Sequence, residues 1–253
     1  MLQALLPEAG NSGGQRGIGQ RPTPGGNGRA ALANSIERQR QSGVMAAMLR
    51  LRGRWHDAVI ANQKAIAADD AYLAMCRGNV QGLYPLGYVP HNHHFLWFAA
   101  SMGGASAIAR EAALQTAARV NLPELMRQPG FAGLQHYWMT PWFDRVRFGR
   151  WDEIAAEGNP APDLPYVTAI WNYAQALAAL RQGRTDVAAE HHAALAKLAA
   201  DPVLETLMVW DRYPLSHAAR IAERTVAAEL ALARKDTASA IAALREGVVI
   251  EDT

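Results

Sequence analysis

A short pattern occurs three times in this chain, as GRWHDAV at residues 53–59, GRWDEIA at residues 149–155 and GRTDVAA at residues 183–189. In each copy, glycine provides the backbone freedom that the chain needs where one helix stops. Acidic residues follow within four positions, where they suit the positive end of the next helix. The pattern therefore predicts a tight turn between two helices at three places.

Residues beyond these turns extend the prediction. Ala58 and Ala188 are small, so they would let the two helices of a pair approach each other closely. A fourth pair is predicted at the C-terminal end, with residues 225–233 as its first helix and residues 238–248 as its second. In this pair Lys235 stands where the turn glycine would be.

The spacing of the copies matches a known repeat. The second and third copies begin 34 residues apart, which is the period of tetratricopeptide repeats. Over residues 44–253 the chain resembles a tetratricopeptide-repeat protein. The resemblance implies an all-α fold in which antiparallel helix pairs stack into a right-handed superhelical solenoid. A further pair is expected over residues 94–102 and 105–120, and prolines after the Gly149 turn predict a short second helix there.

The chain is more closely similar to a divergent bacterial group of such proteins. The matching residues are YVPHNHHFL at 88–96, Pro141-Trp142, RFGRWDE at 147–153 and WNYA at 171–174. A histidine-rich stretch before the first turn belongs to that pattern but is absent here, and the pattern continues beyond Thr253. The chain thus resembles a truncated or rearranged member of the group.

The N-terminal residues differ from the rest in composition. Eight of the 21 glycines lie between Gly10 and Gly28, with almost no apolar side chains among them. Such a segment buries too little surface to offset the entropy of ordering, so residues 1–43 are predicted to be disordered. Eight arginines against Glu37 make residues 9–54 basic, but without interleaved aromatic residues they do not indicate nucleic-acid binding.

The overall composition excludes several other classes. The net charge is +2, which implies neither nucleic acid nor an anionic membrane surface as a partner. Charged and polar residues interrupt every long apolar stretch, so no transmembrane helix is expected. With no signal peptide recognised, a cytoplasmic location is expected for the chain as it stands, although a longer parent could be exported. Cys76 is the only cysteine, which excludes an internal disulfide.

Histidines form the most suggestive cluster. If Pro90 precedes a helix, His91 and His94 share one face of it and His93 points elsewhere. Two ligands do not make a catalytic zinc site, which requires three from the protein. His136, flanked by Glu124 and Asp144, is the nearest candidate for a third. The alternative is structural or ligand-contacting use, with Asn92 capping the helix; this interpretation is favoured, so no metal or cofactor is expected.

Aromatic residues are concentrated between residues 97 and 151, and they suggest a binding groove. First helices line the concave face of a repeat superhelix. The candidate ligand-binding residues on that face are Tyr88, His91, His94, Trp97, Trp142 and Arg147. Aromatic walls and a guanidinium would suit a peptide segment or an anionic small ligand.

Two functions remain open. The sequence contains no nucleophile elbow, no phosphate-binding P-loop and no complete catalytic set, so a non-catalytic scaffold that binds a protein or peptide partner is favoured. The alternative is a metal- or small-ligand-binding protein, or an enzyme, that uses the His91/His94 helix start. A role without catalysis is therefore favoured over an enzymatic one.

Overall fold

The structure is a computed structural model that describes residues 53–76, 84–209 and 213–253. The predicted disordered segment, residues 1–43, lies wholly outside these residues. The predicted repeat domain, residues 44–253, lies partly outside them. Within them the chain is mostly helical, which confirms the all-α prediction. No helix in the described ranges is both long and apolar enough to cross a membrane.

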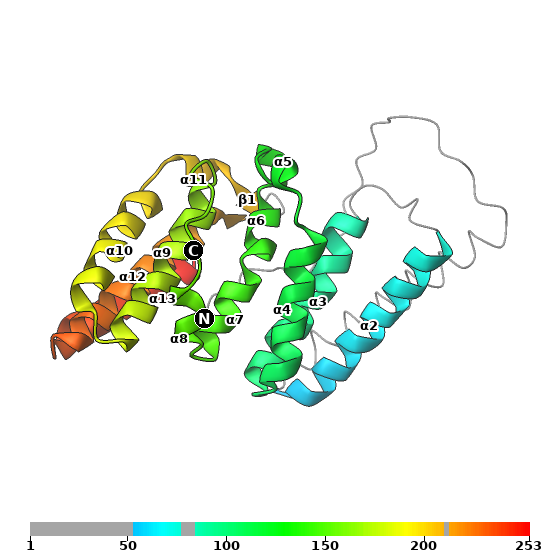
Figure 1. Cartoon of the computed structure of the whole chain (residues 1–253), viewed down its shortest axis with the longest axis horizontal. Coiled ribbons are helices and arrows are strands. Elements are labelled where there is room, and N and C mark those ends of the chain that lie inside the picture. The colour runs from blue at the N-terminus through cyan, green and yellow to red at the C-terminus, as the bar shows by residue number, and fades with distance from the viewer. Residues whose placement is uncertain (1–52, 77–83, 210–212) are drawn as a thin grey trace.

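Three long helices of the first part pack side by side (Figure 1). They are α2 (Trp55–Met75), α3 (Val89–Met102) and α4 (Ser106–Arg119), with a π-helical turn, η1 (Tyr84–Tyr88), directly before α3. Alanine, the strongest helix former, supplies much of α2 and α4. The observed pair α3 and α4 matches the predicted pair, except that α3 begins earlier, at Val89.

Short helices follow in the middle of the chain. They are α5 (Pro123–Met126), the 3-10 turn η2 (Pro129–Phe131), α6 (Gly133–Trp138), α7 (Thr140–Arg147) and α8 (Trp151–Ala155). Pro141 lies in the first turn of α7, where its missing N–H leaves no helical hydrogen bond unmade. The prediction of a short helix after Gly149 is confirmed, since α8 has five residues.

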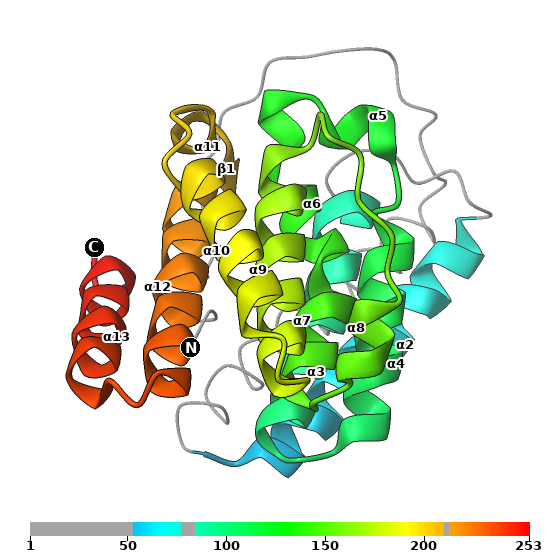
Figure 2. The ribbon, with the colours of Figure 1, turned by 60° about the vertical axis from the view of Figure 1, so that its left-hand side comes forward.

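The last part consists of two long helix pairs (Figure 2). Its elements are α9 (Pro165–Arg181), α10 (Thr185–Ala199), α11 (Val203–Thr206), α12 (Leu215–Ala233) and α13 (Thr237–Glu251). Between α11 and α12, β1 (Met208–Val209) pairs antiparallel with β2 (Tyr213–Pro214). The predicted C-terminal pair is present, and its first helix begins ten residues earlier than expected because Leu215 and Ala218 extend its buried face.

One backbone conformation ends the helix before each tight turn. Gly104, Gly149, Gly183 and Lys235 all have positive φ, between 64° and 74°. The next residue donates its N–H to a carbonyl five positions earlier, as in the 2.8 Å bonds from Arg150 to Arg145 and from Arg184 to Ala179. Carbonyls that the helix end would leave free are thereby satisfied. Gly53 has the same conformation before α2. The predicted turns at Gly149 and Gly183 are confirmed, whereas the helix expected before Gly53 lies outside the described residues.

A fixed position after each of these turns is buried. Counted five residues on from the positive φ, the residues are Ala58, Ala109, Ile154, Ala188 and Ala240, and each is at most 2% exposed. Four of the five are alanine, which lets the helix that follows the turn lie close to its neighbour. The prediction for Ala188 is confirmed, and the same burial occurs at two turns that lack the GR pattern. Ala58 is buried as well, but the helix expected to pair with α2 lies outside the described residues.

One hydrophobic core runs through the helices from α2 to α12. It includes Val59, Leu96, Ile170 and Leu230, which come from four different helices. A separate cluster of Ala228, Ala231, Ala240 and Ala243 joins α13 to α12. Because the same core continues from helix to helix, side chains distant in sequence are held at fixed positions around the pocket described below.

Lys235 has a side chain in a conformation that favours glycine, with φ of 64°. Holding a residue other than glycine in the left-handed conformation costs about 1–2 kcal/mol. Replacing it with glycine removes this cost, but glycine also makes the unfolded chain more flexible, which cancels part of the gain. We expect Lys235→Gly to raise the free energy of unfolding by about 0.5–1 kcal/mol, measured by urea denaturation. Gly183→Ala is the matched control: its Cβ would meet nothing within 4 Å, so backbone strain alone should lower stability. Equal stability of both variants would contradict this account.

Candidate functional site

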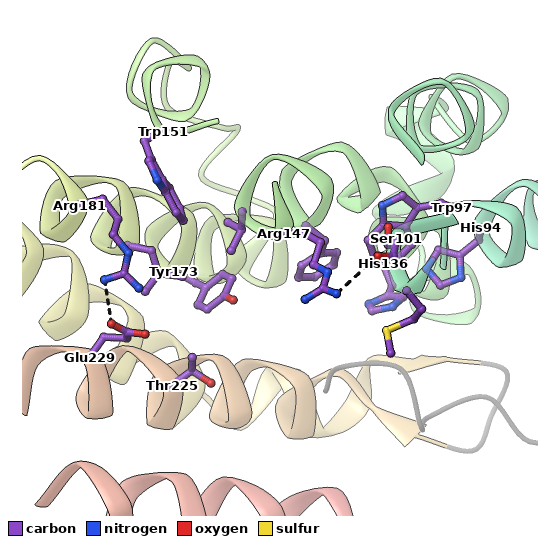
Figure 3. Close-up of a pocket in the computed structure, with 14 residues that line it drawn as sticks. His94, Trp97, Ser101, His136, Arg147, Trp151, Tyr173, Arg181, Thr225 and Glu229 are labelled. Atoms are coloured by element: carbon purple, nitrogen blue, oxygen red, sulfur yellow. Dashed lines mark hydrogen bonds and ion pairs between the residues drawn. The ribbon is translucent and has the colours of Figure 1, made fainter. Parts of the chain in front are cut away.

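A pocket of about 390 Å³ lies between α3, α7 and α9 on one side and α12 on the other (Figure 3). Aromatic rings and two guanidinium groups dominate its lining. The lining residues are His94, Trp97, Ser101, Met102, His136, Phe143, Val146, Arg147, Trp151, Tyr173, Leu177, Arg181, Thr225 and Glu229. Its volume is within the range of small-molecule and side-chain binding sites.

Three of the six predicted binding residues line this pocket, namely His94, Trp97 and Arg147. The other three lie elsewhere. Tyr88 is 42% exposed and its ring neighbours Tyr84. The ring of His91 packs edge-on against Phe95, with centroids 4.0 Å apart, and Trp142 packs against Trp138.

Of the three histidines that follow Pro90, only His94 lines the pocket. His94 is buried, and its ring lies 5.2 Å from Trp97 and 5.7 Å from His136, centroid to centroid. His93 instead accepts a 2.9 Å hydrogen bond from Arg119. Burial, followed by the positive charge of Arg119, lowers the pKa of His93 to about 4. Among the described residues, no three His, Cys, Asp or Glu side chains are grouped as metal ligands.

Asn92 does not cap α3, so that prediction is wrong. Val89 and Pro90 already belong to the helix, which places Asn92 inside it with its side chain buried. Its Nδ2 donates to Asp69 of α2 at 2.8 Å, and the Tyr84 hydroxyl donates to the same carboxylate. Burial raises the pKa of Asp69 despite these two donors. Asn92 therefore ties α3 to α2.

His136 forms part of the pocket wall from α6. It is 8% exposed, and its Nδ1 shares a 2.7 Å hydrogen bond with the hydroxyl of Tyr166. Burial lowers the pKa of His136 to about 4 and raises that of Tyr166. The ring is therefore neutral at pH 7 and contributes an apolar, hydrogen-bonded surface rather than a charge.

Asp144 orients Trp97, one of the aromatic residues that line the pocket. Its buried carboxylate accepts the indole N–H of Trp97 at 3.2 Å and a guanidinium N–H of Arg150 at 2.7 Å. Burial raises the pKa of Asp144, and the Arg150 charge and the Trp97 donor oppose that rise. Arg150 belongs to the turn after α7, so the same turn that ends the helix also orients Trp97.

An ion pair that the sequence analysis did not predict also lines the pocket. Arg181 of α9 contacts Glu229 of α12 at 2.9 Å, and its guanidinium lies 5.8 Å from the Trp151 ring centroid. Tyr173 lies nearby, and burial together with the Glu229 charge raises its pKa to about 12. Tyr173 belongs to the WNYA stretch, but nothing in the sequence indicated that α12 would face it.

Arg147 differs from Arg181 in having no carboxylate partner within the described ranges. Its Nη2 lies 3.5 Å from the carbonyl oxygen of Ser101, at the C-terminal end of α3. The side chain is exposed and borders the pocket, as Figure 3 shows. The pocket thus offers buried rings next to a positive charge that is open to a ligand.

Comparison with known proteins adds no assignment to this geometry. No family model matches the sequence, and neither a curated protein nor a solved structure has a significant match to it. Function is therefore inferred from the chemistry of the pocket itself.

The pKa of His136 makes stability depend on pH. Its ordinary value is 6.5 and its value in the folded chain is about 4, so the unfolded state binds the proton first as the pH falls. The stabilisation is complete above pH 6.5 and is lost toward pH 4, by on the order of 3 kcal/mol. We expect His136→Gln to make unfolding free energy less dependent on pH over this range, measured by urea denaturation at each pH. His56→Gln is the matched exposed control, and an unchanged slope in His136→Gln would contradict the assignment.

Removing the carboxylate of Asp144 should destabilise the fold strongly. Asp144→Ala leaves the Arg150 guanidinium and the Trp97 indole N–H without their acceptor in a buried place. The expected loss is about 3 kcal/mol of unfolding free energy, measured by chemical denaturation. Asp186→Ala, at an exposed carboxylate in the first turn of α10, should change stability by less than about 0.5 kcal/mol. Similar losses in the two variants would argue against the support role of Asp144.

Proposed function

We propose that this chain is a non-catalytic scaffold of the tetratricopeptide-repeat type. In this proposal, antiparallel helix pairs over residues 44–253 stack into a right-handed superhelix. The repeated turn supports it, because the same positive φ and the same buried residue five positions later occur at turns throughout the described part. Such recurrence is expected where each helix pair must bury its apolar face against the next.

We further propose that the scaffold binds a segment of a protein or peptide partner in the pocket between α3, α7, α9 and α12. The pocket itself carries this proposal: it combines buried aromatic rings with an available guanidinium and lies among helices of all three parts of the chain. Met102, 44% exposed at the pocket, adds a flexible apolar contact of the kind used in peptide binding. Helical-repeat surfaces commonly recognise extended segments in this way.

The alternative function, a metal- or small-ligand-binding protein or an enzyme at the His91/His94 helix start, has less support. One observation favours it: His94 and His136 line the same pocket with their rings 5.7 Å apart. His91, however, packs on Phe95 away from the pocket. His136 is engaged with the Tyr166 hydroxyl, and its low pKa makes it a weak base at neutral pH.

A bulky residue in the pocket should block binding without disturbing the core. Thr225 lines the pocket from α12 and is only partly buried, so Thr225→Trp fills the space where a bound segment would lie. We expect a phage-displayed library of random 12-residue peptides to yield a recurrent sequence family on the immobilised intact chain. Recovery of that family should fall by at least about tenfold on Thr225→Trp, the loss expected when a central contact is removed.

Ala242→Trp provides the matched control, because Ala242 is exposed on α13 and does not line the pocket. It should recover the same peptides as the unmodified chain. Circular dichroism during heating verifies that both variants fold. If Thr225→Trp retains the recovered family in full, the pocket is not the binding site; if the intact chain enriches no family at all, the scaffold proposal fails.

A further inference from the structure

Ser101 carries a buried polar atom that the fold leaves unused. The residue is 4% exposed and lines the pocket near the end of α3. Within the described part of the chain, its Oγ has no hydrogen-bond partner. A buried hydroxyl without a partner costs free energy, and such groups in native proteins call for an explanation such as a ligand.

The Arg147 guanidinium contacts the backbone of the same residue. Its Nη2 is 3.5 Å from the backbone oxygen of Ser101 itself, so the charge and the hydroxyl belong to one corner of the pocket. Contact with a single carbonyl at that distance leaves most of the five N–H donors of the guanidinium available. Helices α3 and α7 each contribute one of these two groups.

The acidic groups near this corner are already engaged. Glu229 is the only carboxylate among the pocket-lining residues, and it pairs with Arg181. Asp144, below Trp97, accepts from Trp97 and Arg150. The positive charge of Arg147 therefore has no internal counter-charge in the described structure, and an incoming anion would supply it.

We infer that this corner is a carboxylate subsite, and that the bound segment presents an Asp or Glu side chain to Arg147 and Ser101, with an aromatic side chain next to it in the pocket. The guanidinium would donate two hydrogen bonds to the carboxylate oxygens and the Ser101 hydroxyl one. Trp97, Phe143 and Tyr173 would contact the neighbouring aromatic ring. One guanidinium and one hydroxyl, with Glu229 in the same pocket, match a single negative charge better than a phosphate dianion. The inference rests on the proposed peptide-binding function and specifies its chemistry.

Two peptide libraries that differ only in charge test the subsite. One has a fixed central Phe-Glu pair and the other a fixed Phe-Gln pair, each flanked by three random residues on both sides. We expect the intact chain to retain Phe-Glu peptides about tenfold better than Phe-Gln peptides, the preference that one charge-assisted contact provides. This preference should disappear in Arg147→Gln and weaken severalfold in Ser101→Ala.

Control variants separate this role from a structural one. Arg245→Gln removes an exposed arginine of α13 that does not line the pocket, and it should keep the full preference. Ser101→Ala removes an unsatisfied hydroxyl, so its thermal midpoint should equal or exceed that of the unmodified chain while its preference falls. A merely structural role of Ser101 would lower both.

The outcomes distinguish the subsite from the function on which it rests. Equal retention of both libraries by the intact chain, with loss of both on Thr225→Trp, would leave peptide binding standing and overturn the carboxylate subsite. A Phe-Glu preference that persists in Arg147→Gln would also overturn it. A third library with a fixed Phe-phosphoserine pair that is retained tenfold better than Phe-Glu would reassign the corner to phosphate. No retention of any library would refute the peptide-binding function and the subsite together.

Discussion

The structure depends on how its helices end. At each tight turn one residue adopts positive φ, and the following N–H returns to a carbonyl five positions earlier. The helix therefore ends within one residue of the turn, and the next helix runs back beside it. The residue five positions on, alanine at four of the five positions, is buried. Conformational freedom at Gly149 and Gly183 therefore fixes the positions of side chains far from either glycine.

The pocket is a consequence of that arrangement. Helix α7 ends at the Gly149 turn, which places Arg150 where it can pair with Asp144 and thereby orient Trp97 of α3. The Gly183 turn ends α9 next to Arg181, whose guanidinium reaches Glu229 on α12. The Arg181–Glu229 pair thus links α9 to α12 at the pocket, and the Arg150–Asp144 pair supports Trp97 of its lining. Arg147 also lines the pocket and retains a charge that no described carboxylate neutralises.

The polar groups around the pocket have two different roles. Asp144 and His136 are buried and hydrogen-bonded, and burial shifts their pKa values, so the stability of the fold depends on them. Ser101 and Arg147 are available, and the fold gains little from either. Groups that contribute to binding rather than to stability are expected to have this character, because the free energy of satisfying them is realised only when a ligand is present. Substitution of Asp144 or His136 should therefore change the stability of the fold, whereas substitution of Ser101 or Arg147 should change ligand binding.

The sequence by itself determined the helical character, the turns at Gly149 and Gly183, the turn position of Lys235, and Ala58 and Ala188 as small residues at positions that are buried. These features are local, because a residue's conformational preference and its distance from a turn can be read along the chain. It also selected His94, Trp97 and Arg147, which line the pocket, but it grouped them with Tyr88, His91 and Trp142, which do not. Only the tertiary structure decided which of these side chains converge, that Asn92 reaches Asp69, and that α12 closes the pocket with Thr225 and Glu229. Those outcomes depend on how helices distant in sequence pack against one another, and short-range spacing contains no information on that.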